Sequence, residues 1–219
     1  MSEIIEVDEV WYPPANILYH GDRKLREEID NSLRKQINEM MSTAIMVIGM
    51  NKLHGENYRL QPVNPNEQTP DVRTMRIVPQ KESFNILEVQ EIEVVTLETH
   101  SSEGVDDFLK RTKLNSKKAY PHTTTILCHI NKDLKGSKSW AEVRKALKGV
   151  GIPNDVFVLA RVDPVDHKYQ LVKVHPTLEF VEFNVNTELN SAPSQKVLKM
   201  TPGSVVEYRE LKEEHIPFE

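Results

Sequence analysis

Three oxygen-bearing side chains, those of Asp71, Glu88 and Gln90, have a spacing that suits a divalent cation. Asp71 follows Pro70 and opens one expected strand, while Glu88 and Gln90 occupy alternate positions on the next. Side chains two residues apart on a strand share a face, because successive side chains alternate between faces. Such oxygens are the ligands of Mg2+ or Mn2+, and the bound cation can polarise a phosphoryl oxygen. The pattern predicts a metal site at Asp71 and Glu88, with Gln90 placed to orient a water molecule.

A second acidic pair, Glu91 with Glu93, lies on the other face of the same expected strand. A shift of one residue in strand register exchanges the two faces, so the sequence leaves both pairs open as partners of Asp71. We favour Glu88 and Gln90 because they lie on the more apolar face, where burying a polar pair is costly without a purpose. The simpler interpretation of Glu91 and Glu93 is an exposed strand face.

A helix before these strands is expected to support the site. Apolar side chains recur at helical spacing from Leu25 to Ile48, and Asp22 is the expected N-cap. Asp30 lies at the edge of the apolar stripe and could add a contact to the metal. This pattern predicts one long helix that packs against the sheet.

The remaining elements alternate between strands and short helices. β-branched and apolar runs bounded by Pro, Gly and polar turns predict strands at residues 58–61, 72–78, 84–97, 123–130, 155–162, 169–174 and 178–184. Short helices are expected after Ser102 and after Ser139, which is a good N-cap residue. We expect one domain over residues 1–185, followed by a polar tail or appendage over residues 186–219.

The composition excludes several classes of site. The single cysteine, Cys128, lies in an apolar run and is expected to be a small buried residue. The eight histidines include no HExxH motif or close ligand pair, which argues against a zinc enzyme. The chain also has no phosphate-binding loop and no GxGxxG motif.

Positive charge is concentrated in one segment, although the formal net charge of the chain is -5. Residues 110–148 contain two acids and eleven basic residues, namely Lys110, Arg111, Lys113, Lys117, Lys118, Lys132, Lys135, Lys138, Arg144, Lys145 and Lys148. Lys and Arg dominate phosphate binding, so this segment is expected to contact DNA. A solvated surface helix and loop explain the same charges equally well.

The order of elements around the acidic residues resembles that of the PD-(D/E)xK nuclease superfamily. The resemblance covers about residues 23–131, and its motif is Pro70-Asp71 followed after sixteen residues by Glu88-Val89-Gln90. The family usually has lysine where Gln90 stands, and Lys81 or Lys113 is the candidate to replace it. The resemblance implies an α/β (α+β) fold with a central mixed sheet flanked by helices, a restriction-endonuclease-like core and extra C-terminal strands.

This resemblance implies an Mg2+- or Mn2+-dependent DNA endonuclease or a related phosphodiesterase, with Asp71, Glu88 and Gln90 as catalytic residues. The alternative is a non-catalytic, nuclease-like binding or assembly protein, for example one encoded by a phage or mobile element. No apolar run is long enough to span a bilayer and the N-terminus is acidic, so no membrane association and a cytoplasmic location are expected. The sequence leaves open whether the chain forms a homodimer.

Overall fold

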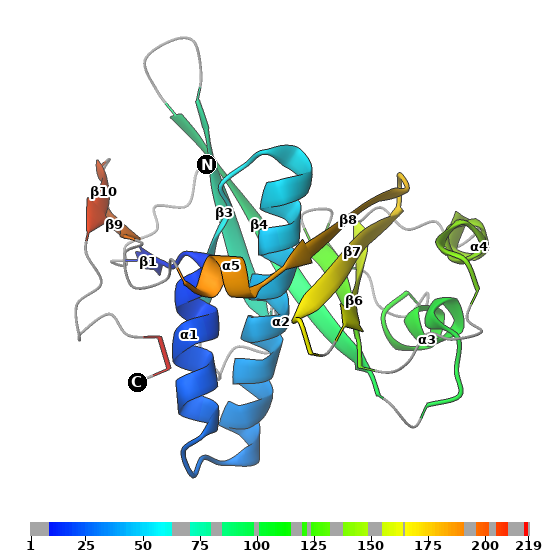
Figure 1. Ribbon diagram of the computed structural model, residues 1–219. Coiled ribbons are helices and arrows are strands. Elements are labelled where there is room, and N and C mark those ends of the chain that lie inside the picture. The colour runs from blue at the N-terminus through cyan, green and yellow to red at the C-terminus, as the bar shows by residue number, and fades with distance from the viewer. Residues whose placement is uncertain are drawn as a thin grey trace.

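The fold is α+β, with a large, mixed and curled sheet flanked by helices (Figure 1). The computed structural model describes residues 9–62, 71–79, 85–98, 101–114, 120–121, 124–131, 138–148, 155–163, 165–190, 196–201, 205–209 and 217–218. The elements are β1 (Glu9–Trp11), α1 (Pro14–Leu25), α2 (Asn31–His54), β2 (Arg59–Pro62), β3 (Val72–Pro79), β4 (Asn85–Leu97), α3 (Val105–Thr112), β5 (Thr124–Ile130), α4 (Trp140–Leu147), β6 (Val156–Asp163), β7 (Lys168–His175), β8 (Glu179–Asn184), α5 (Asn186–Leu189), β9 (Val197–Thr201) and β10 (Val205–Arg209).

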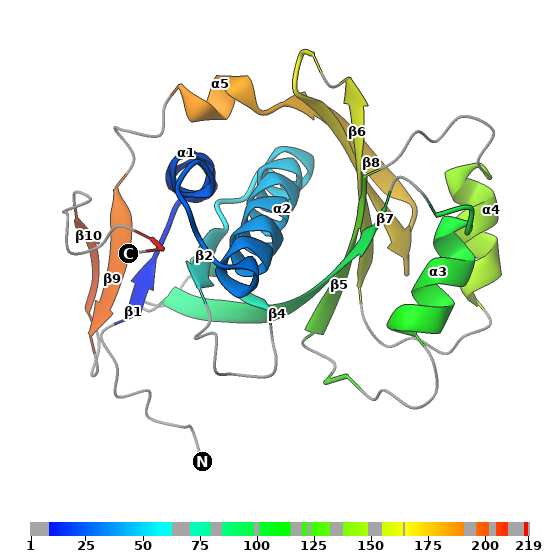
Figure 2. The same cartoon turned by 90° about the horizontal axis from the view of Figure 1, so that it is seen from below.

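The large sheet has seven strands in the order β2-β3-β4-β5-β6-β7-β8. Strands β4, β5 and β6 run parallel, and the other neighbours are antiparallel. Helices α1 and α2 lie inside the curl of the sheet, whereas α3 and α4 lie on its outer side (Figure 2). The prediction of a mixed sheet flanked by helices is therefore confirmed at this level.

The predicted strands agree with the described ones to within one residue at each end. The two faces of the large sheet pack in two separate hydrophobic cores. On β4, Ile92 and Val94 pack in the core beside α2, whereas Leu97 packs in the core under α3 and α4. Within the C-terminal segment, β9 pairs with β1 and β10 in a separate three-stranded sheet. None of the described helices has the length and apolar character needed to cross a membrane.

The prediction of one long helix is wrong, because α1 and α2 are separate. Asp30 is the N-cap of α2, and its Oδ1 accepts a hydrogen bond of 2.8 Å from the backbone N–H of Leu33. Asp22 lies within α1 and pairs with Arg26 at 2.6 Å. Both helices bury apolar side chains in the same core, so hydrophobic periodicity continued across the break and concealed it.

Helix α2 approaches β7 and β8 closely at Gly49. A Cβ atom added there would lie 2.8 Å from side-chain carbons of both Leu171 and Phe183. We therefore expect Gly49→Ala to lower the free energy of unfolding by about 1–3 kcal/mol, measured by urea denaturation. Gly55→Ala is the control, because a Cβ there has open space but the φ of 68° costs about 1 kcal/mol. An unchanged stability of Gly49→Ala would contradict this close packing.

Candidate functional site

Strand register decides which acid accompanies Asp71. Val72 lies opposite Ile92 in the antiparallel β3–β4 pair, and both side chains enter the core beside α2. Asp71, one residue earlier, therefore belongs to the opposite face, next to Glu93. Its Oδ2 accepts a hydrogen bond of 2.7 Å from the backbone N–H of Val94, which fixes the carboxylate at this point of β4. Glu93 is buried, whereas Asp71 is partly exposed.

Glu88 lies elsewhere on β4, and the structure does not bring it together with Asp71. Glu88 is opposite Arg76, which donates a hydrogen bond of 2.6 Å to its Oε2 and also pairs with Glu56. Glu88 is six residues from Val94, to which Asp71 is bonded, and six residues of strand span about 20 Å. The expected pairing of Asp71 with Glu88 is therefore corrected to a pairing with Glu93.

Gln90 faces the same side of the sheet as Glu88 and lies opposite Thr74. Its Oε1 is buried and has no hydrogen-bond partner among the described residues. Asp71 faces the other side, so Gln90 does not join it either. The preference for the more apolar face failed because Asp71 precedes Val72, a core residue, and therefore points away from that face.

Lys113, at the end of α3, completes an ion pair beneath the sheet. Its Nζ lies 2.6 Å from Oε2 of Glu93, and both side chains are nearly buried. Burial lowers the pKa of Lys113, but the hydrogen bond and charge of Glu93, with Tyr120 and Asp71, raise the pKa above its ordinary value overall. The ammonium group therefore keeps its proton at neutral pH. Lys81, the other candidate lysine, lies outside the described residues.

Glu39 on α2 is the acid that sequence reasoning missed. Burial raises its pKa, and the negative charge of Asp71 raises it further, against the opposing effects of Lys35 and Lys113. The sequence did contain a signal for Glu39. It lies between Ile37 and Met40, two buried residues of the apolar stripe of the helix. Asp30, the residue expected from the sequence to provide the helix carboxylate, instead caps α2.

We define the acidic site as Glu39, Asp71 and Glu93 together with Lys113. No three His, Cys, Asp or Glu side chains in the described part of the chain are close enough to surround a metal ion by themselves. Mg2+ commonly uses one or two carboxylates and completes its shell with water and substrate phosphates. Oε1 of Glu93 is buried without a hydrogen-bond partner among the described residues, which leaves one carboxylate oxygen for a cation. Asp71 and Glu93 thus fit a two-carboxylate site.

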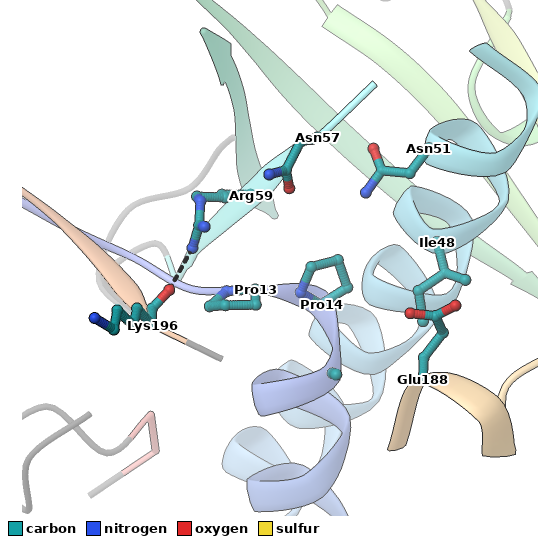
Figure 3. Close-up of a pocket in the computed structure, with 9 residues that line it drawn as sticks. Pro13, Pro14, Ile48, Asn51, Asn57, Arg59, Glu188 and Lys196 are labelled. Atoms are coloured by element: carbon teal, nitrogen blue, oxygen red, sulfur yellow. Dashed lines mark hydrogen bonds between the residues drawn. The ribbon is translucent and has the colours of Figure 1, made fainter. Parts of the chain in front are cut away.

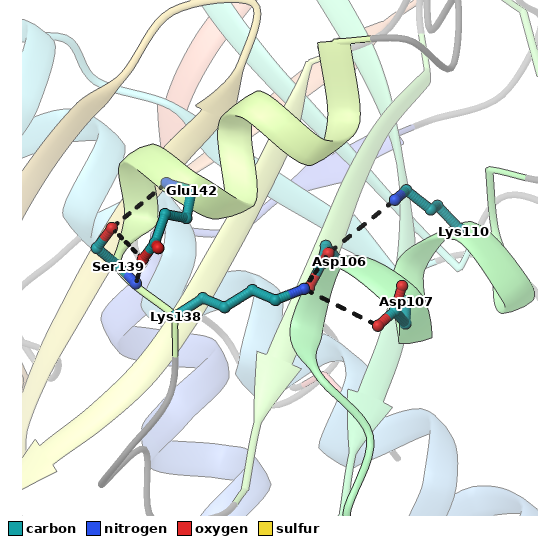
Figure 4. Close-up of polar contacts among 6 residues, drawn as sticks. All are labelled: Asp106, Asp107, Lys110, Lys138, Ser139 and Glu142. Carbon is teal, nitrogen blue, oxygen red and sulfur yellow. Dashed lines mark hydrogen bonds and ion pairs between the residues drawn. The ribbon is translucent and has the colours of Figure 1, made fainter.

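The basic segment is partly neutralised by acids just before it, Asp106 and Asp107. Asp106 is 2% exposed, and its Oδ2 lies 2.7 Å from Lys138 and 4.0 Å from Lys110 (Figure 4). Arg111 likewise pairs with Glu103. Four of the eleven basic residues, Lys117, Lys118, Lys132 and Lys135, lie outside the described residues. DNA binding by this segment stays a prediction.

Three of the cavities lined by described residues lie on the α2 side of the sheet; one, of about 790 Å³, lies between α1 and Tyr169 of β7, and two are smaller. Of these two, one has a volume of about 750 Å³ and lies beside the acidic site, since Glu39 and Val94 belong to its lining. The other has a volume of about 300 Å³ and lies between the start of α1 and the segment from Asn57 to Arg59 (Figure 3). Arg59 and Lys196 both line this cavity, and Arg59 donates a hydrogen bond of 2.7 Å to the backbone oxygen of Lys196.

Cys128 is fully buried on β5, as predicted. Cys128 lies opposite Val95, two residues beyond Glu93 on the same face of β4, and packs in the core under α3 and α4. Comparison of this chain with protein-family models, with curated proteins and with solved structures found no match.

Proposed function

We propose that this protein is an Mg2+- or Mn2+-dependent nuclease that acts on DNA, with Asp71 and Glu93 as the residues that hold the cation. One observation carries the proposal: the β3–β4 register places Asp71 beside Glu93, and Lys113 contacts the same carboxylate. Two carboxylates can hold a cation, and a lysine beside them can offset the negative charge that develops in phosphodiester hydrolysis. A related DNA-processing phosphodiesterase would use the same set.

A restriction-endonuclease-like core also belongs to the proposal. With the register corrected, the motif strand contributes Glu91-Ile92-Glu93 in place of Glu88-Val89-Gln90. The position that is usually lysine in the PD-(D/E)xK superfamily then holds Glu93, and Lys113 supplies an ammonium group from α3. In this proposal, a lysine from α3 takes the place of the lysine that the family usually has on the motif strand.

Each residue of the acidic site has a distinct part in the proposed reaction. The cation, when bound, supplies polarisation of the phosphoryl oxygen. Lys113 stays protonated and would offset negative charge that develops on the phosphate. Glu39 holds a proton more tightly than an exposed glutamate, because its pKa is raised, and it would accept the proton of the attacking water. Lys and Arg side chains of residues 110–148 would contact the DNA backbone.

A non-catalytic DNA-binding or assembly protein with the same core is the second candidate. The observation that favours it is the ion pair itself, since Lys113 already neutralises Glu93 within the protein. In that case the pair would only stabilise the contact between α3 and the sheet. Salt-sensitive DNA binding without cleavage in Mg2+ or Mn2+ would support this second candidate.

The nuclease proposal predicts metal-dependent cleavage of DNA that depends on Asp71 and Glu93. Asp71→Asn and Glu93→Gln are each expected to reduce the cleavage rate about a hundredfold, because each removes a charge that holds the cation. Gel assays with Mg2+, Mn2+ and EDTA measure the rates. Glu88→Gln is the matched control on the same strand, and it should keep activity because Glu88 is engaged with Arg76.

Two outcomes would overturn this assignment. If the wild-type protein cleaves no DNA with either Mg2+ or Mn2+, only the non-catalytic candidate remains. If Glu88→Gln loses activity and Glu93→Gln keeps full activity, the site lies on the face of β4 that carries Glu88. Circular dichroism of each variant shows that the fold survives.

A further inference from the structure

The cavity of about 750 Å³ has the position and build of a ligand site. It lies between α2 and the carboxyl ends of the parallel strands β4 and β5, where open α/β sheets commonly bind ligands. Its inner wall contains apolar side chains, including Ile45 and Val94, together with Ser42 and His129. Polar side chains of α2 and of the strand ends form its rim. Volumes of 300 to 1,000 Å³ with this arrangement are typical of small-molecule pockets.

The inner wall presents one fixed hydrogen-bond acceptor, Nε2 of His129. Ser42 Oγ donates its single proton to the backbone oxygen of Asn38 at 2.8 Å. The Nδ1 atom of His129, 2.9 Å from the same Oγ, must then be the donor in their hydrogen bond. The proton therefore lies on Nδ1, and Nε2 is left as an acceptor. Burial and the charge of Arg161 lower the pKa of His129 to about 4, so the ring is neutral at pH 7.

The rim adds three side-chain amides and a cation, from Asn31, Asn38, Asn131 and Arg34. Among the described residues, none of these four side chains has a hydrogen-bond or ion-pair partner. Amides offer a donor and an acceptor side by side, which matches the edge of a nucleobase. Arg34 can pair with a phosphate. Lys35 on the rim is already paired with Glu39, and the acid Glu98 also lies there, so a ligand with one phosphate suits the cavity better than a polyphosphate.

We propose that this cavity binds one nucleotide unit, with the base between α2 and the ends of β4 and β5 and the phosphate near Arg34. The apolar wall contacts the faces of the base, and the amides with His129 contact its edge. A base inside a stacked duplex cannot enter a cavity, so the unit is a free mononucleotide or an unpaired nucleotide of a strand. Binding of an unpaired nucleotide of a strand rests on the proposed nuclease function, because Glu39 lines the cavity and also belongs to the acidic site.

Titrations in EDTA test this inference separately from cleavage, since no metal or catalysis is involved. The probes are deoxyadenosine monophosphate, ribose 5-phosphate, and a short oligonucleotide as a single strand and as a duplex. We expect the mononucleotide to bind with a Kd of about 1 mM in NMR titrations and ribose 5-phosphate to bind far more weakly. Asn38→Ala should weaken binding about tenfold, as loss of one hydrogen bond does.

Asn57→Ala is the matched control, because Asn57 is also exposed but lines the 300 Å³ cavity (Figure 3). Its mononucleotide affinity should equal that of the wild-type protein. Tighter binding of the single strand than of the duplex identifies an unpaired strand nucleotide as the ligand, whereas binding of the mononucleotide alone identifies the free form. The inference is overturned if the mononucleotide shows no saturable binding, if ribose 5-phosphate binds equally well, or if Asn38→Ala has no effect.

Discussion

Replacing Lys113 by methionine is expected to lower the free energy of unfolding by about 3–5 kcal/mol. Lys113 and Glu93 form an ion pair of 2.6 Å with side-chain exposures of 12% and 6%. Methionine fills a similar volume but removes the positive charge, and the carboxylate of Glu93 is then buried without a counter-charge. Urea denaturation at pH 7 measures the loss.

Two further variants separate the charge effect from packing. The double variant Lys113→Met/Glu93→Gln should recover much of the lost stability, because no unpaired charge is then buried. Lys35→Met removes a lysine that is 77% exposed and lies 3.5 Å from Glu39, and it should change stability by less than about 1 kcal/mol. Equal losses in Lys113→Met and in the double variant would show that the ion pair contributes little.

The same variant also bears on the proposed cation. Without the ammonium group, Glu93 offers both oxygens, so Mn2+ should stabilise Lys113→Met more than the wild-type protein. Thermal unfolding with increasing Mn2+ measures this difference. Equal shifts in the two proteins would argue that Lys113 and a cation do not share Glu93, and would favour a purely structural ion pair.

The seven strands of the large sheet were predictable from the sequence because turn residues bound each of them, whereas β1, β9 and β10 were not predicted. Strand β4 shows the limit of that reasoning, since both of its faces carry polar and apolar residues in similar number. Which face accompanies Asp71 depends on whether Val72 enters the core, and that is settled by the contact of β3 with α2. Periodicity finds a strand but does not fix its register with a neighbour.

The partners of the polar side chains on β4 come from distant parts of the chain. Glu88 is satisfied by Arg76, which also reaches Glu56 beyond the end of α2. Glu93 is satisfied by Lys113 from α3. Local spacing contains no information about such contacts, so it could not show that Glu88 lies opposite Arg76 and not beside Asp71. Glu39 was missed for the same reason, because only the tertiary fold brings it near enough to Asp71 for their charges to interact.

The second large effect expected is a loss of stability in mild acid through His129. Burial, with a smaller effect from Arg161, lowers the pKa of His129 from 6.5 to about 4 in the folded protein. Between these values the unfolded chain binds a proton that the folded protein does not bind. The stabilisation is therefore complete above pH 6.5, and about 3 kcal/mol of it is lost as the pH falls towards 4.

Comparison with a variant isolates this contribution from those of the acids. His129→Gln keeps a polar side chain beside Ser42 but does not titrate, so the difference in stability between wild type and variant should narrow by about 1.4 kcal/mol per pH unit below pH 6.5. His54→Gln, at an exposed position at the end of α2, controls for the change of residue type. A difference between wild type and His129→Gln that stays constant from pH 7 to pH 4 would mean that His129 gains its proton equally in both states. Nε2 would then carry a proton in about half of the molecules at pH 6.5, so this measurement also tests the electrostatic basis of the proposed nucleotide site.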